Sequence, residues 1–260
     1  MLFQKAIEIG DTLYKAFDTP NRMRLTRWNF KAAAGGVVQE AGESVLVSEI
    51  GSPTFEFTRL SQLSGDPRYF DAIQHVMDVF EDQQDKTNQP SMWPVVINVR
   101  TGDFTGFSGF TIGGMADSLY EYLPKEHMLL RGATQQYRRL YEYAVIVIKR
   151  NIFHRPMTFN GEDVRLTGQV DRDARTPSSE TTTEPQAQHL DCFAGGMVAI
   201  AAKISQNDND LALAQKRVAR LPLGLQRHAV WVDARDIACG AMREGRTLSM
   251  GRVNMAQQDE

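Results

Sequence analysis

Amphipathic segments of helical length follow one another in pairs along this chain, and short turn signals separate the two members of a pair. Apolar residues recur in these segments near the helical period, and prolines and glycines mark their ends. Such helices can bury their apolar stripes only against each other, so the pattern predicts an all-α fold of stacked helical hairpins. The predicted helices cover residues 2–17, 49–63, 67–84, 113–130, 135–152 and 189–204.

Short β excursions are predicted between these pairs. The stretch MWPVVINVRTGDF at 92–104 has β-branched runs interrupted by TGD, which indicates a short extended pair. A small hairpin is predicted at 157–170, with Asn160-Gly161 at its turn. The polar, proline-flanked stretch TPSSETTTEPQAQ at 176–188 predicts a mobile surface loop that buries nothing.

The composition is that of a globular domain and excludes several classes of partner. The chain has 260 residues, 42% of them hydrophobic, which is enough for a real apolar core. Its formal net charge of -3 gives no strong field for nucleic acid or for an anionic bilayer. We find no apolar run of the roughly 18–20 residues that a bilayer requires, and the first ten residues lack the apolar centre of a signal peptide. The two cysteines are too few for a disulfide scaffold or a four-thiolate zinc site.

Two pairs of acidic residues have helical spacing. Glu49 and Glu56 are seven residues apart, and Asp117 and Glu121 are four apart, so each pair would share one helix face if its helix is continuous. Aromatic residues flank both pairs, and carboxylates among aromatic rings suit sugar binding, because rings stack on pyranose C–H faces while carboxylates accept hydroxyl hydrogen bonds. Solvated surface pairs are the ordinary alternative. The residues alone leave both interpretations open.

His189 follows the polar loop and opens an apolar segment, so its imidazole can point into a cavity, although a surface position at a helix start is the ordinary alternative. HExxH, GxSxG, P-loop and CxxC patterns do not occur, which argues against zinc proteases, serine hydrolases and nucleotide enzymes. Two prolines, Pro53 and Pro124, fall inside predicted helices, where each is expected to introduce a kink.

Several long stretches resemble one family. They are EIGSPTFEFTRLSQLSGDPRYFDA at 49–72, MWPVVINVRTGDF at 92–104, FTIGGMADSLYEYLPKEH at 110–127 and HLDCFAGGMVAIAAK at 189–203. They are similar to the class I α-1,2-mannosidases of glycoside hydrolase family 47, and most similar to the fungal branch, which FDTPNRMRLTRWNF at 17–30 supports. The resemblance covers roughly residues 1–210.

This resemblance implies a fold, a reaction and a site. Members of the family fold as an (α/α)7 barrel of seven helical hairpins, of which this chain would form a part. They remove α-1,2-linked mannose from high-mannose N-glycans with inversion, use a calcium ion, and work in the secretory pathway or outside the cell. By matching motif, Asp117 is the catalytic aspartate, and Glu56, Glu121 and His189 line the sugar subsite, with Glu49 grouped among the substrate-binding residues.

The chain also departs from the family pattern. We do not find the FExxIR glutamate, the RPExxES motif or the terminal threonine that binds calcium within these 260 residues. We therefore expect residues 1–210 to be a partial mannosidase domain that is inactive by itself. Residues 211–260 show no family pattern and are consistent with disorder or a change of reading frame. The family pairs Cys192 with a later cysteine, whereas Cys239 lies in this tail.

Two alternatives remain. The chain could be a non-catalytic binder of high-mannose glycans, which keeps the sugar contacts without the chemistry. It could also be a helical scaffold whose carboxylates are merely solvated.

Overall fold

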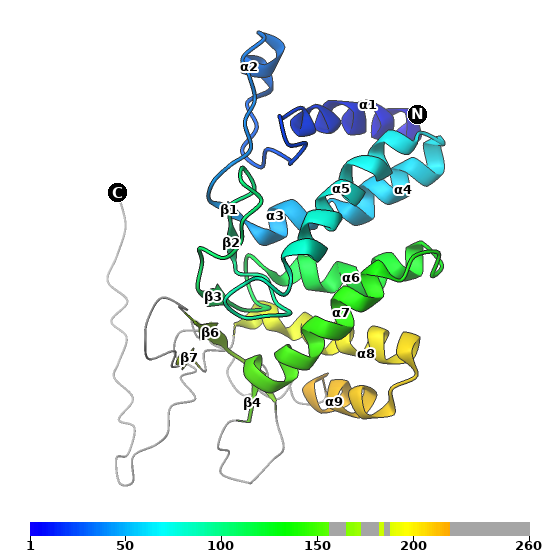
Figure 1. Cartoon of the computed structure of the whole chain (residues 1–260). Coiled ribbons are helices and arrows are strands. Elements are labelled where there is room, and N and C mark those ends of the chain that lie inside the picture. The colour runs from blue at the N-terminus through cyan, green and yellow to red at the C-terminus, as the bar shows by residue number, and fades with distance from the viewer. Residues whose placement is uncertain (156–164, 173–181, 185–187, 219–260) are drawn as a thin grey trace, which may run out of the picture.

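The helices lie in consecutive pairs in the computed structural model, which describes residues 1–155, 165–172, 182–184 and 188–218 (Figure 1). The α-helices are α1 (Leu2–Tyr14), α2 (Phe30–Ala34), α3 (Val47–Gly51), α4 (Thr54–Ser64), α5 (Pro67–Gln83), α6 (Asp117–Leu129), α7 (Gln136–Val147), α8 (Phe193–Ser205) and α9 (Asp208–Val218). Two 3-10 turns, η1 (Lys15–Phe17) and η3 (His189–Cys192), and one π-helical turn, η2 (Ile148–Ile152), adjoin them.

Three hairpins form the stack. α4 packs on α5, α6 on α7, and α8 on α9, while α6 lies between α4 and α8 and contacts both. The turns inside the hairpins lie at one end of the helices, and the strands lie at the other end (Figure 1). The mostly helical fold of hairpins is thus confirmed. The described residues form an open stack, and a closed ring of seven hairpins is not formed within them.

The first hairpin shows how the sequence sets its turns. Gly65 ends α4 with a φ of 75°, in the left-handed region where glycine has no steric penalty. The Asp66 side chain then accepts a hydrogen bond from the backbone N–H of Arg68 at 3.0 Å, and Pro67 is the first residue of α5. The break between the helices predicted over 49–63 and 67–84 is therefore confirmed.

Two predicted helix boundaries are wrong. The helix predicted over 49–63 is interrupted: α3 ends at Gly51 and α4 begins at Thr54. Pro53 lies at the N-terminal boundary of α4, because proline has no N–H to give to a preceding turn. The helix predicted from Gly113 begins at Asp117. Pro124 lies within α6, whose helical backbone continues past it, and its kink stays a prediction.

The β excursions are short and antiparallel. The strands are β1 (Val45–Leu46), β2 (Val96–Ile97), β3 (Gly109–Phe110), β4 (Phe153–His154), β5 (Leu166–Thr167), β6 (Gln169–Asp171) and β7 (Thr182–Glu184). β1 pairs with β2, β3 with β6, β6 with β7, and β4 with β5.

Three predictions concern these strands. In the predicted pair at 92–104, Asn98 and Asp103 form an antiparallel bridge. β4 and β5 pair around the predicted 157–170 hairpin, but β4 lies at 153–154, before the predicted start, and the Asn160-Gly161 turn lies outside the described residues. Within the predicted loop 176–188, Thr182–Glu184 form β7, so that part of the loop prediction is wrong. These three residues are exposed, and they join the sheet through backbone pairing with β6.

The core lies between the hairpins and the strand-bearing end. Trp93 is fully buried, and its indole Nε1 donates to the carbonyl oxygen of Phe80 on α5 at 2.8 Å. The backbone N–H of Trp93 donates to the hydroxyl of Tyr120 on α6 at 3.1 Å. These contacts satisfy buried polar groups while joining α5, α6 and the segment that carries β2. The fold thereby fixes the position of α6.

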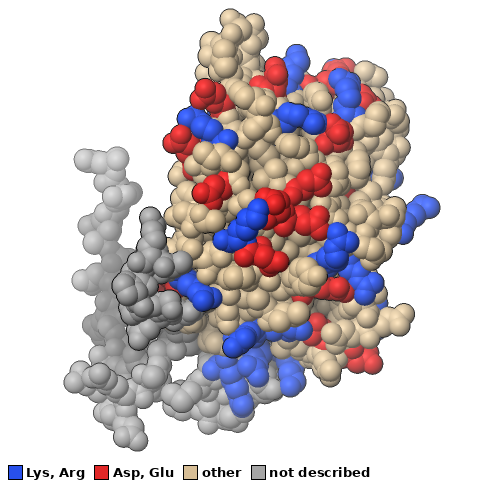
Figure 2. Space-filling view, in the orientation of Figure 1, with Lys and Arg blue, Asp and Glu red and all other residues tan. Residues whose placement is uncertain are grey.

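The surface mixes both signs of charge. On the face shown in Figure 2, acidic and basic side chains of the described residues are interspersed. This distribution matches the small net charge of the chain. Within the described ranges, no helix combines the length and the apolar character needed to span a membrane.

Candidate functional site

Asp117 is the first residue of α6, and the turn before it places its carboxyl group. The backbone N–H of Asp117 donates to the carbonyl oxygen of Gly113 at 2.9 Å, which closes this turn. Burial raises the pKa of Asp117, hydrogen bonds from backbone N–H groups lower it, and the charge of Glu121 raises it further. Asp117 therefore keeps its proton to a higher pH than an exposed aspartate does.

Glu121 lies one turn further along α6, as its four-residue spacing predicts. Its Oε1 atom is 2.6 Å from Nζ of Lys125, which follows after another turn. The Glu121 side chain is 30% exposed, so its charge is only partly screened by solvent. Asp117 and Glu121 thus form an acidic row along one helix.

Glu56 comes to α6 from α4. The hydroxyl of Tyr122 donates to Oε1 of Glu56 at 3.1 Å, and the Phe55 and Tyr122 rings have centroids 5.4 Å apart. Burial, followed by the charge of Glu56, raises the pKa of the Tyr122 hydroxyl to about 12. Glu56 is exposed. A carboxylate and two rings from two helices therefore meet at the surface beside Glu121.

Glu49 belongs to a different helix, so the prediction that Glu49 and Glu56 share one continuous face is wrong. The break at Pro53 places Glu49 on α3, where its Oε1 atom pairs with Nη2 of Arg27 at 2.8 Å. Its backbone carbonyl accepts a hydrogen bond from Arg24. The polar contacts of Glu49 are thus with the segment before β1.

His189 is the first residue of η3, but its side chain lies outside what the structure describes. Its assignment to the sugar subsite stays a prediction.

Asp191, two residues later, is a site residue that the sequence reasoning missed. It is 5% exposed. Its Oδ2 atom accepts a hydrogen bond from the backbone N–H of Gln188 at 2.8 Å and another from the Thr167 hydroxyl. Burial raises the pKa of Asp191, and the charge of Asp117 adds to this rise. The sequence feature that could have pointed to Asp191 is that it is a single acidic residue within the apolar segment HLDCFAGG.

Glu126 was missed as well. It is fully buried on α6, and the hydroxyl of Thr58 on α4 donates to its Oε1 atom at 2.5 Å. Burial raises the pKa of Glu126 to about 7. The hydrogen bond from Thr58 opposes this rise, and the charge of Glu56 adds to it. The sequence could have indicated that Glu126 lies on the buried face of α6, because residue 126 continues the helical spacing of the core residues Leu119 and Leu123.

The described residues do not fit a metal ion or a disulfide. Among them, no three His, Cys, Asp or Glu side chains converge in a way that could hold a metal. Calcium prefers six to eight oxygen ligands, and the described residues provide no such group. Cys192 forms no disulfide with any described residue, and burial raises the pKa of its thiol. Cys239 lies outside the described residues.

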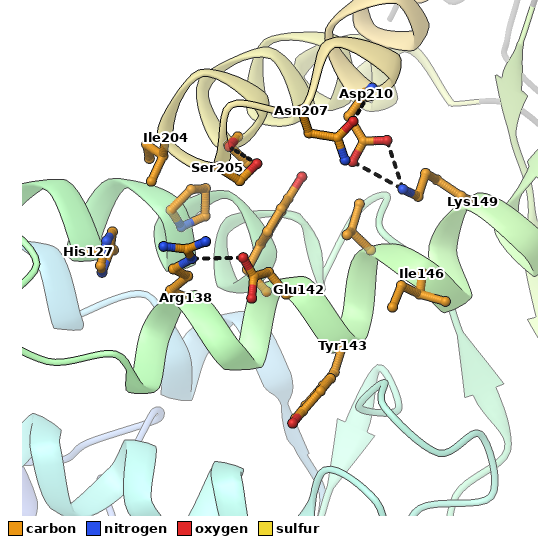
Figure 3. A pocket seen from close by; sticks show the side chains of 14 residues that line it. His127, Arg138, Glu142, Tyr143, Ile146, Lys149, Ile204, Ser205, Asn207 and Asp210 are labelled. Atoms are coloured by element: carbon orange, nitrogen blue, oxygen red, sulfur yellow. Dashed lines mark hydrogen bonds and ion pairs between the residues drawn. The ribbon is translucent and has the colours of Figure 1, made fainter.

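A hollow of about 440 Å³ lies between α7 and the α8–α9 hairpin and is also lined by Pro124 and His127 of α6 (Figure 3). Two ion pairs lie at it, Arg138–Glu142 at 2.7 Å and Lys149–Asp210 at 2.8 Å. None of the predicted site residues lines it. The row on α6 and this hollow are therefore two separate features.

Comparison with known proteins links the chain to a family of glycosidases. Residues 1–222 match the family described as glycosyl hydrolase family 47. Mannosyl-oligosaccharide 1,2-alpha-mannosidase IB of Mus musculus is 31% identical over 210 residues, which cover 78% of this chain and 30% of the mouse protein. The endoplasmic reticulum mannosyl-oligosaccharide 1,2-alpha-mannosidase of Homo sapiens is 27% identical over 224 residues, 83% of this chain and 29% of that protein.

A solved structure shares the fold. An alpha-1,2-mannosidase from Trichoderma reesei matches with a TM-score of 0.71 and 23% identity, over 83% of this chain and 42% of that one. The chain spans about 30% of the length of the mouse and human relatives.

Proposed function

This chain belongs to glycosyl hydrolase family 47 and is related to mannosyl-oligosaccharide 1,2-α-mannosidases, and from that premise we propose that α4 and α6 form a mannose subsite. The ligand is a terminal α-1,2-linked mannose of a high-mannose N-glycan. In the complete catalytic domain, this subsite belongs to an (α/α)7 barrel that hydrolyses the linkage with inversion. The relative named for the endoplasmic reticulum supports a place in the secretory pathway.

The observation that carries the proposal is the contact between Tyr122 and Glu56 beside the Asp117–Glu121 row. A pyranose presents hydroxyl groups around its edge and C–H groups on its faces, so it needs acceptors and rings together. Glu56 and Glu121 supply acceptors, and the Phe55 and Tyr122 rings supply an apolar surface at the same place. The four residues are provided by two packed helices, which makes the arrangement rigid.

Asp117 takes the proton-transfer role in this proposal. Its raised pKa suits a group that must hold or exchange a proton near the scissile bond. An inverting glycosidase also needs a second carboxyl group about 6.5–9.5 Å away, with room for a water molecule. We expect the 260-residue chain by itself to bind the glycan without releasing mannose, because the second group is not identified among its residues.

Glycan binding with matched variants tests this proposal. We would titrate the chain with α-1,2-mannobiose, using α-1,6-mannobiose as the linkage control. Glu121→Gln should weaken binding about 10-fold or more, because it removes a charged acceptor. Glu142→Gln is the control, since Glu142 forms the same kind of one-turn ion pair, with Arg138, on α7. Equal effects of the two variants would contradict the subsite.

Mannose release separates the remaining possibilities. Retention of a high-mannose glycan on the immobilised chain, with no free mannose, would agree with binding without hydrolysis. Release that stops when a chelator is added would show catalysis and overturn our expectation of inactivity. The absence of both retention and release would favour a helical scaffold.

A further inference from the structure

Asp191 is buried next to the turn from which α6 begins, although it is 74 residues further along the chain than Asp117. Its Oδ1 atom is shielded from solvent and has no hydrogen-bond partner among the described residues. A Cβ atom at Gly113 would lie 2.5 Å from this oxygen, so only a glycine allows the turn to approach so closely. The carboxyl group of Asp191 therefore packs directly against the Gly113–Gly114 turn.

Hydrogen bonds fix both partners in this contact. Gln188 Oε1 accepts from the backbone N–H of Gly114 at 2.8 Å. The backbone N–H of the same Gln188 donates to Asp191, in a reciprocal capping arrangement at the start of η3. Thr167 of β5 donates to Asp191 as well. The turn is thus connected to η3 and, through η3, to β5.

The other side of the turn leads to Asp117. Gly113 N–H donates to the Thr111 hydroxyl at 3.0 Å, and Gly113 C=O accepts from the N–H of Asp117 at 2.9 Å. A displacement of the turn would therefore move the first residue of α6. We propose that Asp191 is a positioning residue for Asp117 and acts through the Gly113–Gly114 turn.

The charges around the two carboxyl groups agree with this role. Asp191 interacts with Asp117 on α6, with Arg217 on α9 and with Cys192 on its own turn. Asp117 interacts with Glu121 on its own helix. Burial dominates for both carboxyl groups, and the charge of Asp117 disfavours ionisation of Asp191. Burial raises the pKa of Asp191 and so disfavours its charged form, and asparagine, a neutral side chain of the same shape, is therefore the conservative replacement.

This inference rests on the proposed function only for the chemical role of Asp117, so its test uses no glycan. Carboxyl ¹³C NMR of the full chain would follow the titration of Asp117 and Asp191, and hydrogen exchange would follow the amides of Gly114 and Asp117. The variants are Asp191→Asn, which retains an acceptor for Gln188 and Thr167, and Asp191→Ala, which removes it. Asp18→Asn, at an exposed aspartate, is the control.

We expect Asp191→Asn and Asp18→Asn to behave as the wild type does. Asp191→Ala should let water reach the turn, move the titration of Asp117 to lower pH, and speed exchange of the Gly114 amide about 3- to 10-fold. Wild-type values for both quantities in Asp191→Ala would overturn the inference, and so would an Asp191→Asn variant that behaves like Asp191→Ala.

One measurement does not depend on whether Asp191→Ala folds. Asp117→Asn removes the neighbouring charge, so the titration of Asp191 should move to lower pH. An unchanged Asp191 titration would show that the two groups are not neighbours and would overturn the inference. If these results hold while the chain fails to bind mannobiose, the proposed function fails and the positioning role stands.

Discussion

At the residue scale, Glu126 is the clearest departure from an ordinary apolar core. A buried carboxyl group prefers its neutral form, and the Thr58 hydrogen bond does not compensate fully for lost hydration. Its second oxygen, Oε2, accepts no hydrogen bond within the part of the chain that the structure describes. Burial therefore favours the protonated form of Glu126, although the hydrogen bond from Thr58 favours the charged form.

This burial predicts a stability that depends on pH. The pKa of Glu126 is about 7 in the folded chain, against about 4.5 for an unperturbed glutamate. Below pH 4.5 both states are protonated, so Glu126 contributes no pH dependence. Between pH 4.5 and 7 the unfolded state loses its proton first, so stability falls as pH rises, by roughly 3 kcal/mol in total.

Glu126→Gln should remove that fall. In urea unfolding, the variant should match the wild type near pH 4.5 and exceed it by up to about 3 kcal/mol at pH 8. Glu8→Gln, at an exposed residue of α1, serves as the control for the loss of a carboxyl group. A difference between Glu126→Gln and the wild type that does not change with pH would show that Glu126 is ionised in the folded chain.

Among the individual residues of the site, the sequence predicts the positions of some and not of others. Asp117 and Glu121 could be placed together because their spacing within one helix is a local property. Glu49 was misplaced because Pro53 interrupts the helix between it and Glu56. Asp191 could not be placed, since its contacts with Thr167 and with Gly113 depend on the packing of distant segments.

At the scale of elements, close approach between helices depends on small residues. The Gly51 position at the end of α3 packs against Leu119 of α6, and a Cβ atom there would overlap the leucine side chain. Leu119 is itself buried, so it has little room to move. The sequence did not predict this contact, because it predicted one helix over 49–63 and not a separate short helix α3.

Gly51→Ala should therefore destabilise the chain by about 1–3 kcal/mol, as overpacking does. Gly196→Ala is the matched control, because it is exposed in α8 and has open space around a Cβ atom. We expect it to stabilise the chain by up to about 1 kcal/mol through higher helix propensity. Thermal unfolding measures both, and a neutral or stabilising Gly51→Ala would show that α3 can shift away from α6.

At the scale of the whole molecule, the α8–α9 hairpin is the outer member of the described stack. Lys149, in the π-helical turn after α7, pairs with Asp210 of α9, whose side chain is 14% exposed (Figure 3). In stacked helical pairs, each unit is stabilised mainly by its neighbours, so a terminal pair can open without the others. The Lys149–Asp210 pair is then expected to control opening of α9.

Asp210→Asn should loosen α9 alone. We expect its amides to exchange about 5- to 30-fold faster, which corresponds to roughly 1–2 kcal/mol for a partly buried ion pair, while α4–α5 stays unchanged. Asp208→Asn is the control, since Asp208 lies in the same first turn of α9 but is exposed. Equal exchange in the two variants would mean that the helix dipole, rather than Lys149, accounts for the effect.

The hairpin turns at 65–66, 130–135 and 206–207 lie together at the end of the stack opposite the strands (Figure 1). A 13-residue helix such as α6 is about 20 Å long, at roughly 1.5 Å per residue. A dye or surface tether attached at the turn 130–135 would thus stand about 20 Å from Asp117, at the other end of α6. Immobilisation through that turn would keep the support at the end of α6 opposite Asp117, so 130–135 is the suitable attachment point for binding sensors.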